Sequence, residues 1–557
     1  MVALYKDFKI LFIIILFLLW EPIYSQTLSF RDEAIPRGLT FIHDNGGTDQ
    51  KYYVETMGSG CCLIDYDGDK DLDIFFLQGA PLPGWEKDVI LRNQLFRNDG
   101  GQFVNVTGES GLGDTSYGIG CSVADYDNDG DADLYITNFG EDILYRNEGN
   151  GTFADVSYVA GISNSSWGST AVFFDADLDG WLDIFVVNYI DYSIKDNPWC
   201  GEKHINRRTY CSPDMFSGTK DQIYHNNGDG TFSDMSKITN ISKLTGKGLG
   251  IAISDIDNDS DMDIYVSNNN LMNFLYINDS TGIFRENALF AGVGYNENGQ
   301  AESGTGVDFG DYDRDSFLDL FVTNISGESN RLYKNDGNGI FSDVTSTVGL
   351  GKDSFKLSGF STKLVDLDLD GWLDIFIVNG HVQDNINLIN KSYTHAQKKQ
   401  VFINNGQGSF IDKTDEIGGD VLTPSVGRSA AFGDIDNDGD VDVIISNSNG
   451  QANLLINEGK PANNWIGIQL NGRIYNIDSI GAKVQVKTQS GIQWAMINPS
   501  GSYLSSNDKR LQFGIGKDVK IDEIIIDWPG GGIDRIEDIK PNHYYLIQPG
   551  GAISTIW

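Results

Sequence analysis

One acidic pattern of nine residues recurs seven times in this chain and constrains its fold more than any other feature. Aspartate occupies positions 1, 3, 5 and 9 of every copy, and position 8 is an apolar residue or alanine. We number these acidic loops one to seven in chain order. Their aspartates are, loop by loop, Asp65, Asp67, Asp69 and Asp73; Asp125, Asp127, Asp129 and Asp133; Asp175, Asp177, Asp179 and Asp183; Asp255, Asp257, Asp259 and Asp263; Asp311, Asp313, Asp315 and Asp319; Asp366, Asp368, Asp370 and Asp374; and Asp434, Asp436, Asp438 and Asp442.

Carboxylates this close together repel one another at pH 7 unless several are protonated or a cation sits among them. Four alternating aspartates, with Gly at position 6 in four copies, suit a hard cation such as Ca²⁺ that takes many oxygen ligands. An EF-hand is excluded, because position 12 is a strand residue such as Ile136 and not Glu. The remaining alternative is a metal-free scaffold of Asx turns. Sevenfold recurrence favours calcium, so we expect the 28 aspartates to form structural Ca²⁺ sites.

The residues around each acidic loop repeat as well. A glycine lies seven residues before the first aspartate of each loop, and a run such as "LYITN" or "IFVVN" follows it. Such β-branched and aromatic runs favour strands, and the Asn-Gly and Asp-Gly pairs that come next favour hairpin turns. Each unit is therefore expected to form four strands. Seven such units predict a seven-bladed β-propeller.

The two ends of the repeat region complete each other. The seventh unit stops at "LLINEGK", residues 454–460, without its fourth strand, and "LSFRDEAIPRGL" at 28–39 matches the missing piece. We therefore expect an all-β fold in which a propeller over 26–460 is closed by the N-terminal strand. Residues 464–549 lack the acidic pattern but contain alternating stretches such as "AKVQVKT". They predict a small all-β C-terminal domain packed beside the propeller.

The N-terminus and the charge indicate an exported protein. Lys6 and Lys9 precede an apolar run from residue 10 to 20, which predicts a cleaved signal peptide over 1–25 and no transmembrane span. Secretion to the extracellular space is expected, with the periplasm or a cell surface as alternatives. Asp and Glu number 79 against 40 Lys and Arg, and the net charge of −39 excludes nucleic acid as a partner.

Five cysteines fit an oxidising compartment only partly. Cys200 and Cys211 lie in an irregular segment and could close a disulfide. Cys61, Cys62 and Cys121 precede acidic loops in expected strands, where small buried thiols are the favoured interpretation.

With these residues in view, the chain resembles the FG-GAP/VCBS-repeat family related to cartilage acidic protein. The acidic loops, "FGDYD" at 309–313 and "LYRNEGNGTFADV" at 144–156 carry this resemblance. The C-terminal part resembles the ASPIC/UnbV domain through "DSIGAKVQV" at 478–486 and "IIIDWPGG" at 524–531. The loops are also similar to the calcium hairpins of the integrin alpha-subunit propeller. The resemblance implies an extracellular calcium-binding propeller of a kind often linked with adhesion or ligand binding.

Strand order predicts two faces of the propeller. Acidic loops and Asn-Gly turns share one face, and the long insertions at 79–93, 189–222 and 380–400 share the other. Loops on a rigid scaffold often carry function. The basic and aromatic residues of 189–222 are therefore candidates for binding an extracellular protein or glycan, or they only cover the neighbouring blade. The candidate ligand-binding residues are Trp199, Arg207, Arg208 and Tyr210. A monomer is expected.

An extracellular enzyme is the alternative class. His43, Glu55 and His381 are expected on the insertion face, where they could converge at the mouth of the channel. Two histidines and a carboxylate can hold a transition metal or act as acid and base. The ordinary alternative is that these histidines have no catalytic role.

Overall fold

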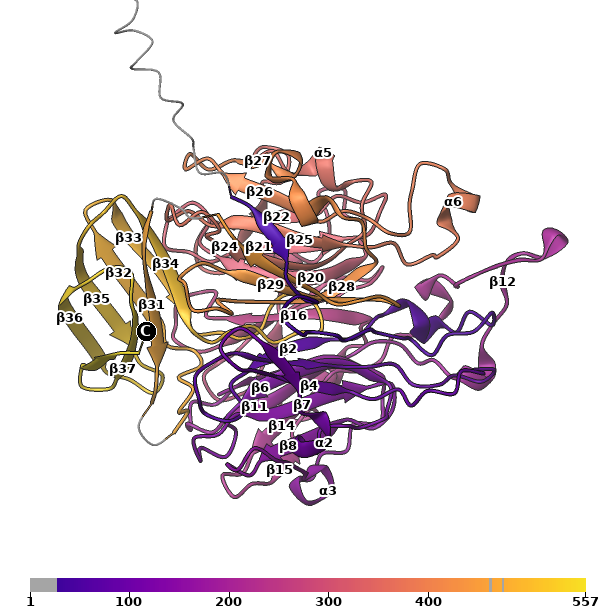
Figure 1. Ribbon diagram of the computed structural model, residues 1–557, viewed down its shortest axis with the longest axis horizontal. Coiled ribbons are helices and arrows are strands. Elements are labelled where there is room, and N and C mark those ends of the chain that lie inside the picture. The colour runs from indigo at the N-terminus through magenta and orange to yellow at the C-terminus, as the bar shows by residue number, and fades with distance from the viewer. Residues whose placement is uncertain (1–27, 460–462, 473–474, 557) are drawn as a thin grey trace, which may run out of the picture.

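The computed structural model describes residues 28–459, 463–472 and 475–556, so the predicted signal peptide lies outside the described residues. Within them, seven antiparallel four-stranded sheets follow one another along the chain (Figure 1). The first strands of the sheets are β2 (Cys61–Ile64), β6 (Gly118–Ala124), β10 (Gly168–Phe174), β16 (Gly248–Ser254), β20 (Gly304–Gly310), β24 (Gly359–Val365) and β28 (Gly427–Gly433). The second strands are β3 (Asp73–Phe76), β7 (Asp133–Asn138), β11 (Asp183–Asn188), β17 (Asp263–Asn268), β21 (Asp319–Asn324), β25 (Asp374–Asn379) and β29 (Asp442–Asn447). The third strands are β4 (Gln94–Asn98), β8 (Ile143–Asn147), β14 (Gln222–Asn226), β18 (Phe274–Ile277), β22 (Arg331–Asn335), β26 (Gln400–Asn404) and β30 (Asn453–Asn457). The fourth strands are β5 (Phe103–Asn105), β9 (Phe153–Asp155), β15 (Phe232–Asp234), β19 (Arg285–Glu286), β23 (Phe341–Asp343), β27 (Phe410–Asp412) and β1 (Phe30–Asp32).

Each acidic loop joins the first strand of a sheet to the second, and its ninth residue begins the second strand. The second strands are rich in β-branched and aromatic residues, as in "DIFVVN" of β11, and every residue of β11 is buried. Buried side chains form apolar clusters between neighbouring sheets, as between the first and the second. The hydrophobic core therefore fixes the position of each acidic loop relative to its neighbours.

The N-terminal strand belongs to the last sheet, as the split repeat predicts. β1 pairs antiparallel with β30, with Phe30 opposite Asn457. The seventh sheet also contacts the first, because β28 lies against β2 and one buried cluster contains Ile74 and Ile444. Two segments at opposite ends of the repeat region therefore share one sheet.

The expectation that Cys62 and Cys121 are free buried thiols is wrong. They form a disulfide, with Cα atoms 6.3 Å apart, between the first strands β2 and β6. These strands contact each other, so alternate residues of each face the neighbouring sheet. Cys61 points the other way, toward Ser429, and is a buried free cysteine.

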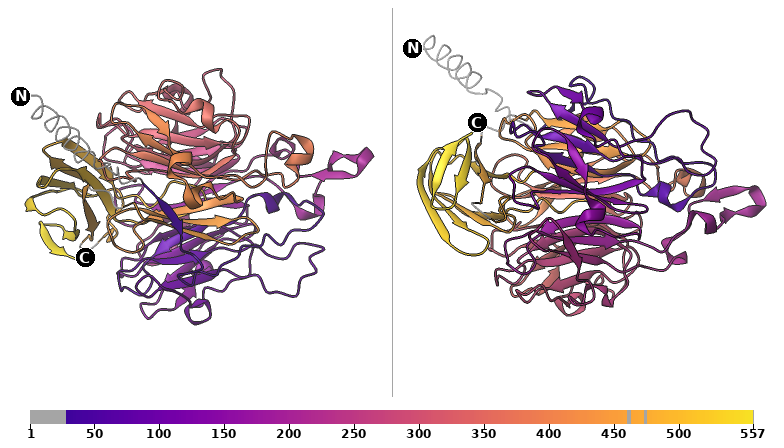
Figure 2. Two further views of the ribbon diagram at one scale, coloured as in Figure 1. Left: turned by 45° about the horizontal axis from the view of Figure 1, so that its top comes forward. Right: turned by 90° about the horizontal axis from the view of Figure 1, so that it is seen from below.

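The C-terminal domain contains two four-stranded sheets. One consists of β34 (Leu511–Gly516), β31 (Asn464–Leu470), β37 (Tyr544–Gln548) and β38 (Ala552–Thr555) in that order. The other consists of β33 (Gly491–Met496), β32 (Lys483–Thr488), β35 (Ile521–Asp527) and β36 (Ile533–Ile539). This two-sheet domain lies on the opposite side of the molecule from the projecting β12 (Cys200–Glu202) and α6 (Ile386–Ile389), as Figures 1 and 2 show.

The sequence predicts that the C-terminal domain packs beside the repeats. In the structure, part of this domain also inserts between the sheets. Residues 499–507, between β33 and β34, are all buried and form hydrogen bonds with the first strands β2, β6, β16, β20, β24 and β28. Ser502 exchanges two backbone hydrogen bonds with Val307 of β20. Tyr503 is fully buried, and its hydroxyl donates to the Met57 carbonyl oxygen at 3.3 Å. We call residues 499–507 the core segment, because they fill the space between the sheets.

The helices in the described residues are short. The α-helices contain four residues each and are α2 (Thr107–Ser110), α3 (Ser157–Ala160), α4 (Ala288–Ala291), α5 (Gly351–Ser354), α6 and α7 (Thr414–Ile417). None of the described helices has the length and apolar character needed to cross a membrane.

Candidate metal centre

The first aspartate of each acidic loop holds the loop closed through backbone hydrogen bonds. In loop two, Asp125 Oδ1 accepts from the Asp129 N–H at 3.1 Å, and its Oδ2 accepts from the Gly130 N–H at 2.9 Å. Loops three to seven repeat this pair of bonds. Loop one differs, because Asp65 accepts from Gly68 and Lys70.

The aspartate at position 9 ties the loop to the third strand of its sheet. Asp133 Oδ2 accepts from the Tyr126 N–H at 3.1 Å, and its Oδ1 accepts from the Asn147 N–H at 2.8 Å. The equivalent two bonds occur in all seven loops. Each oxygen of this carboxylate therefore already accepts a hydrogen bond from the backbone.

A recurring asparagine that the sequence analysis did not single out joins neighbouring loops. Asn147 Nδ2, at the end of β8, donates to the Tyr66 carbonyl oxygen of loop one at 2.9 Å. Each later sheet makes the same bond to the loop before it. In the first sheet, Asn98 Nδ2 donates to the Ile435 carbonyl oxygen of loop seven at 3.2 Å. The signal was present in the sequence, because this asparagine ends the third strand of six units and directly follows β18 in the fourth.

Two residues of each loop adopt a left-handed backbone conformation. Position 6 has a positive φ in every loop, as its frequent Gly predicts. Position 4 is also left-handed throughout, at φ 58° in Asn128 and φ 61° in Leu178. These turns fold the aspartates of positions 1, 3 and 5 back toward one another.

The aspartate at position 3 carries the clearest sign of a missing partner. Its Oδ1 is buried and makes no hydrogen bond in five of the described loops, at Asp127, Asp177, Asp257, Asp313 and Asp436. An unpartnered buried carboxylate oxygen is costly, so its recurrence requires an explanation. Three of these aspartates lie in clusters whose ligand atoms are within 4.8 Å of one another: Asp125, Asp127 and Asp133; Asp175, Asp177 and Asp179; and Asp255, Asp257 and Asp259. The arrangement offers several carboxylate oxygens to one hard cation.

Burial and crowding raise the pKa values of these carboxyl groups in the absence of a cation. Burial, followed by the charge of Asp69, raises the pKa of Asp65 to about 6. Burial, followed by the charge of Asp478, raises the pKa of Asp125 to about 7. Burial raises the pKa of Asp73 to about 8. The metal-free loops therefore carry a free-energy penalty when all their carboxylates are ionised.

Basic side chains reach some of the loops. Lys334 Nζ contacts the carboxylates of both Asp313 and Asp315 in loop five. Lys483 Nζ contacts Asp255 in loop four. In these two loops an ammonium group already compensates part of the negative charge.

The C-terminal domain covers the side of the sheets that bears the acidic loops, which we call the loop face. Trp494 Nε1 donates to Asp311 Oδ2 at 3.0 Å, and the Tyr544 hydroxyl donates to Asp434 Oδ2 at 2.7 Å. Further bonds reach loops two, three and six. The opposite side, bearing the insertions 79–93, 189–222 and 380–400, is the insertion face.

The structure gives His43 no free nitrogen for a metal. Its Nε2 lies 2.9 Å from Ser59 Oγ, and its Nδ1 accepts from the Asn449 N–H at 3.1 Å. Burial lowers the pKa of His43 to about 4. This histidine therefore serves as a neutral, hydrogen-bonded core residue.

Glu55 and His381 also have protein partners. Glu55 is buried, and its carboxylate accepts from the Tyr210 hydroxyl at 2.7 Å and from the Tyr52 N–H at 3.0 Å. His381 Nδ1 accepts from the Gln383 N–H at 2.9 Å, and burial lowers the pKa of His381 to about 4. These contacts give both residues structural partners within the fold.

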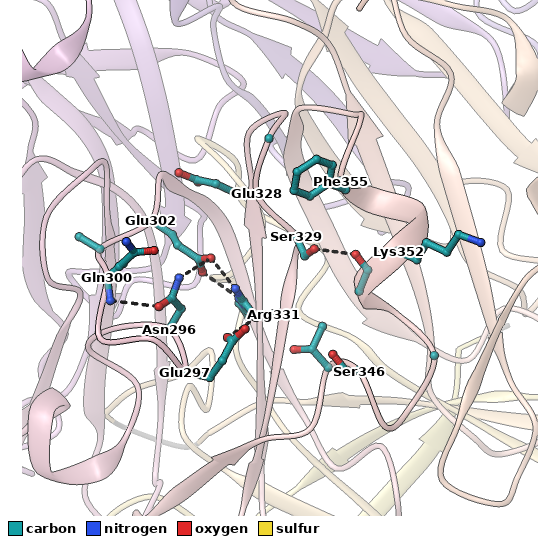
Figure 3. Close-up of a pocket in the computed structure, with 15 residues that line it drawn as sticks. Asn296, Glu297, Gln300, Glu302, Glu328, Ser329, Arg331, Ser346, Lys352 and Phe355 are labelled. Atoms are coloured by element: carbon teal, nitrogen blue, oxygen red, sulfur yellow. Dashed lines mark hydrogen bonds and ion pairs between the residues drawn. The ribbon is translucent and has the colours of Figure 1, made fainter. Parts of the chain in front are cut away.

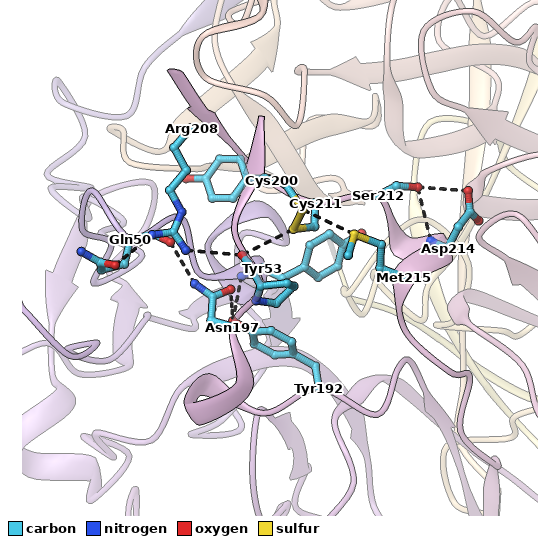
Figure 4. The surroundings of a disulfide bond; sticks show 12 residues. Gln50, Tyr53, Tyr192, Asn197, Cys200, Arg208, Cys211, Ser212, Asp214 and Met215 are labelled. Atoms are coloured by element: carbon cyan, nitrogen blue, oxygen red, sulfur yellow. Dashed lines mark hydrogen bonds between the residues drawn. A yellow bond between two sulfur atoms is a disulfide. The ribbon is translucent and has the colours of Figure 1, made fainter. Parts of the chain in front are cut away.

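The 189–222 insertion is cross-linked internally and also contacts a segment outside it (Figure 4). A disulfide joins Cys200 to Cys211. Arg208 donates to Gln50 Oε1 at 2.9 Å, and Arg207 pairs with Glu202 at 2.8 Å.

The candidate ligand-binding residues of this insertion differ in how far they are exposed to solvent. Tyr210 is buried, and its hydroxyl donates to Glu55 beneath the surface. Its role in ligand binding stays a prediction. Trp199, Arg207 and Arg208 are half-buried. Lys203 Nζ lies 5.5 Å from the centre of the Trp199 ring.

A pocket of about 640 Å³ opens between the segments around Gln300, Arg331 and Lys352 (Figure 3). Arg331 forms ion pairs there with Glu297 at 2.7 Å and with Glu302. The lining contains Glu297, Glu302 and Glu328 against Arg331 and Lys352, so the pocket is acidic and does not suit an anionic ligand.

Family models match most of the chain. The model described as an FG-GAP-like repeat matches residues 65–136, 125–186, 211–266, 255–322, 311–377 and 366–445. The model described as ASPIC and UnbV matches residues 472–554.

Curated relatives match the chain over about half of its length. Cartilage acidic protein 1 of Homo sapiens is 29% identical over 309 residues, which is 54% of this chain and 43% of the relative. Its Mus musculus counterpart is 28% identical over 310 residues, 54% of this chain and 44% of the relative. The match thus spans less than half the length of either relative. Among solved structures, an Agrocybe aegerita lectin that recognises non-reducing terminal N-acetylglucosamine has a TM-score of 0.36 and 18% identity over 64% of this chain and 79% of its own. This likeness is too weak to carry a functional argument.

Proposed function

The chain belongs to the FG-GAP-like repeat family, and on this premise we propose that it is an extracellular, calcium-stabilised β-propeller that binds a protein or glycan ligand. The relatives named cartilage acidic protein 1 support an extracellular setting. The ASPIC/UnbV match supports a separate C-terminal domain. The proposed division is a signal peptide over 1–25, a propeller over 26–460 and a C-terminal domain. The sequence predicts 464–549 for this domain, and β38 extends it to residue 555.

The propeller is proposed to have seven blades and to close on itself. Three contacts between the ends of the repeat region support closure: β1 with β30, β28 with β2, and Asn98 with loop seven. The bond from Asn98 is the one that each other sheet makes to its preceding loop, so the first sheet follows the seventh in the same way. Closure would leave no sheet edge exposed between the first and last blades.

The acidic loops are proposed to bind Ca²⁺ through the aspartates at positions 1, 3, 5 and 9. The observation that carries this proposal is the buried, unpartnered Oδ1 of the aspartate at position 3 in five loops. A bound Ca²⁺ would supply two positive charges to each crowded set of carboxylates. The chain's own residues preorganise the site: the aspartate at position 1 closes the loop, the aspartate at position 9 anchors it to the third strand, and positions 4 and 6 make the turns.

Direct measurement of bound calcium tests this proposal. Equilibrium dialysis of metal-free protein against ⁴⁵Ca²⁺ is expected to give several bound ions per chain. Asp127→Ala is expected to remove one of them, because this change deletes the unpartnered ligand of loop two. The matched control is Asp114→Ala, since Asp114 lies outside every acidic loop. Binding of no calcium by wild type would overturn the proposal.

Ligand binding is proposed for the insertion face. The C-terminal domain covers the loop face, whereas the 189–222 insertion projects on the other side (Figure 1). Trp199, Arg207 and Arg208 supply there the aromatic and guanidinium groups that often dominate binding energy. A screen of glycan and peptide arrays in saturating calcium identifies the ligand.

Variants then locate the binding surface. Trp199→Ala and the pair Arg207→Ala and Arg208→Ala are expected to weaken capture on the array at least tenfold without changing the melting temperature. Asp127→Ala is expected to lower stability and leave capture unchanged at saturating calcium. Loss of capture only in Asp127→Ala would move the ligand site to the loop face.

A further inference from the structure

Loop three differs from the other acidic loops in the side chain that faces it from the third strand of its sheet. The residue just before the recurring asparagine is His225 in this sheet. At the equivalent place the other sheets have Arg97, Arg146, Ile277, Lys334, Ile403 and Ile456. Among these residues, only the histidine offers a nitrogen lone pair to a metal.

The histidine lies within the cluster of loop three. His225 Nδ1 is 3.1 Å from Asp183 Oδ1 and 3.6 Å from Asp177 Oδ2. The three side chains place their ligand atoms within 4.8 Å of one another. The second oxygen of Asp177, Oδ1, is buried and makes no hydrogen bond. Asp175 and Asp179 lie beside them, since both also cluster with Asp177.

These spacings suit a small divalent transition metal. Zinc–nitrogen and zinc–oxygen bonds of about 2.0–2.2 Å at tetrahedral to octahedral angles place neighbouring donor atoms roughly 3–3.6 Å apart. Imidazole favours zinc and its neighbours in the periodic table, whereas calcium takes oxygen ligands. A mixed set of one imidazole and two or more carboxylates therefore selects against calcium relative to an all-oxygen loop.

We propose that loop three is a transition-metal site, with His225, Asp177 and Asp183 as its ligands and zinc as the metal class that fits them. The proposal rests on the proposed function only in taking the acidic loops as cation sites. One loop of the propeller would then differ from the others in the metal it selects. The competing interpretation is a simple ion pair between His225 and Asp183.

The test measures zinc retained by full-length, tag-free protein in excess calcium. Metal-free protein is equilibrated with Zn²⁺ and 2 mM Ca²⁺ and passed through a desalting column. Its zinc content is then measured by inductively coupled plasma mass spectrometry. Wild type is expected to retain one zinc ion per chain. His225→Ile is expected to weaken zinc binding at least tenfold, because it removes the nitrogen ligand and keeps a residue that three other sheets carry at this place.

Two control variants separate the site from adventitious binding. Arg146→Ile makes the equivalent change in the second sheet, and His204→Ala removes an exposed histidine from the 189–222 insertion. Both are expected to retain zinc as wild type does. If His225→Ile fails to fold, His225→Gln keeps a polar side chain of similar length and replaces the imidazole.

The outcomes decide the proposal independently of calcium binding. Zinc that is absent from wild type, or that His225→Ile retains unchanged, would leave only the ion pair and overturn the transition-metal site. The same samples are melted with and without calcium. A calcium-dependent melting temperature combined with no specific zinc would reject this inference while supporting the proposed function. Specific zinc without any effect of calcium would do the reverse.

Discussion

Position 6 of the acidic loops is left-handed in every copy, although Lys70, Ser260 and Ser316 carry side chains there. The φ of Ser316 is 75°, a conformation that costs an ordinary residue about 1 kcal/mol or more. Ser316→Gly is therefore expected to raise the free energy of unfolding by roughly 0.5–1 kcal/mol, less than the full strain because glycine gains entropy in the unfolded chain. Urea unfolding in saturating calcium measures the change. As a control, Ser346→Gly is expected to destabilise, since Ser346 is not left-handed; equal effects of the two changes would argue against strain at position 6.

The carboxylates of the acidic loops should make stability depend on pH in opposite directions with and without calcium. In metal-free protein, burial and crowding hold the pKa of Asp65 near 6, of Asp125 near 7 and of Asp73 near 8, above the unfolded value of about 3.9. A raised folded pKa gives stability that is present below about pH 4 and is lost as the pH rises through these values. Bound Ca²⁺ depresses the same pKa values, so the calcium-dependent stability is present above pH 4 and is lost as the pH falls.

Melting temperatures between pH 5 and pH 8 check this sign. Metal-free protein, prepared by passage over a chelating resin, is expected to melt at a lower temperature at pH 8 than at pH 5. Addition of 2 mM Ca²⁺ is expected to raise the melting temperature above that of the metal-free protein by more at pH 8 than at pH 5. Parallel curves in the two conditions would show that the carboxylates do not hold the cation.

At the scale of elements, the core segment shows where sequence reasoning stops. Strand patterns and the split repeat predict the four-stranded units and the pairing of β1 with β30, because both depend on local periodicity and on counting. "PSGSYLSSN" at 499–507 instead has the composition of an exposed loop. Its burial follows from backbone and hydroxyl bonds to first strands of several sheets, which lie far away in the sequence.

The aspartates of the acidic loops and the cysteines of the first strands also show what the sequence alone cannot predict. Positions 1, 3, 5 and 9 stand out because they repeat. The free Oδ1 of the aspartate at position 3 and the anchoring of the aspartate at position 9 depend on where neighbouring strands place their N–H groups. Likewise, the bond between Cys62 and Cys121 depends on contact between two different sheets, and periodicity within one strand carries no information about that contact.

The core segment is expected to hold the C-terminal domain against the sheets. Tyr503→Ala removes a fully buried ring that lies 5.0 Å from the Phe360 ring centre, and such losses cost about 3–5 kcal/mol. We expect the variant to be cleaved by trypsin or thermolysin near residues 490–510 much faster than wild type. Tyr475→Ala is the control, because Tyr475 is exposed on the same domain. Equal cleavage of all three proteins would show that the segment does not anchor the domain.

The N-terminal strand supplies a second test at this scale. Deletion of 28–44 removes β1 and leaves β30 as an unpaired edge strand, which is expected to cause aggregation. Deletion of 552–557 removes β38, an exposed edge strand, and is expected to be tolerated. Light scattering and circular dichroism compare the two. A soluble, fully folded 28–44 deletion would contradict closure by the N-terminal strand.

At the scale of the whole molecule, charge and fold depend on each other. The chain carries a net charge of −39, and the acidic loops concentrate a large part of it on the loop face beneath the C-terminal domain. Self-repulsion of this kind destabilises a compact state unless cations neutralise it. Calcium in the loops would therefore stabilise both the blades and the docking of the domain that covers them.

The most direct test is calorimetry of wild-type protein, without a tag, in chelator, in 2 mM Mg²⁺ and in 2 mM Ca²⁺. One site filled at one hundred times its dissociation constant adds about 2.7 kcal/mol to the free energy of unfolding, and several such sites add more. We predict that calcium raises the melting temperature by roughly 10 °C or more over chelator, and that magnesium raises it far less because it needs stricter geometry. Superimposable melting curves in chelator and in calcium would contradict a calcium-stabilised fold.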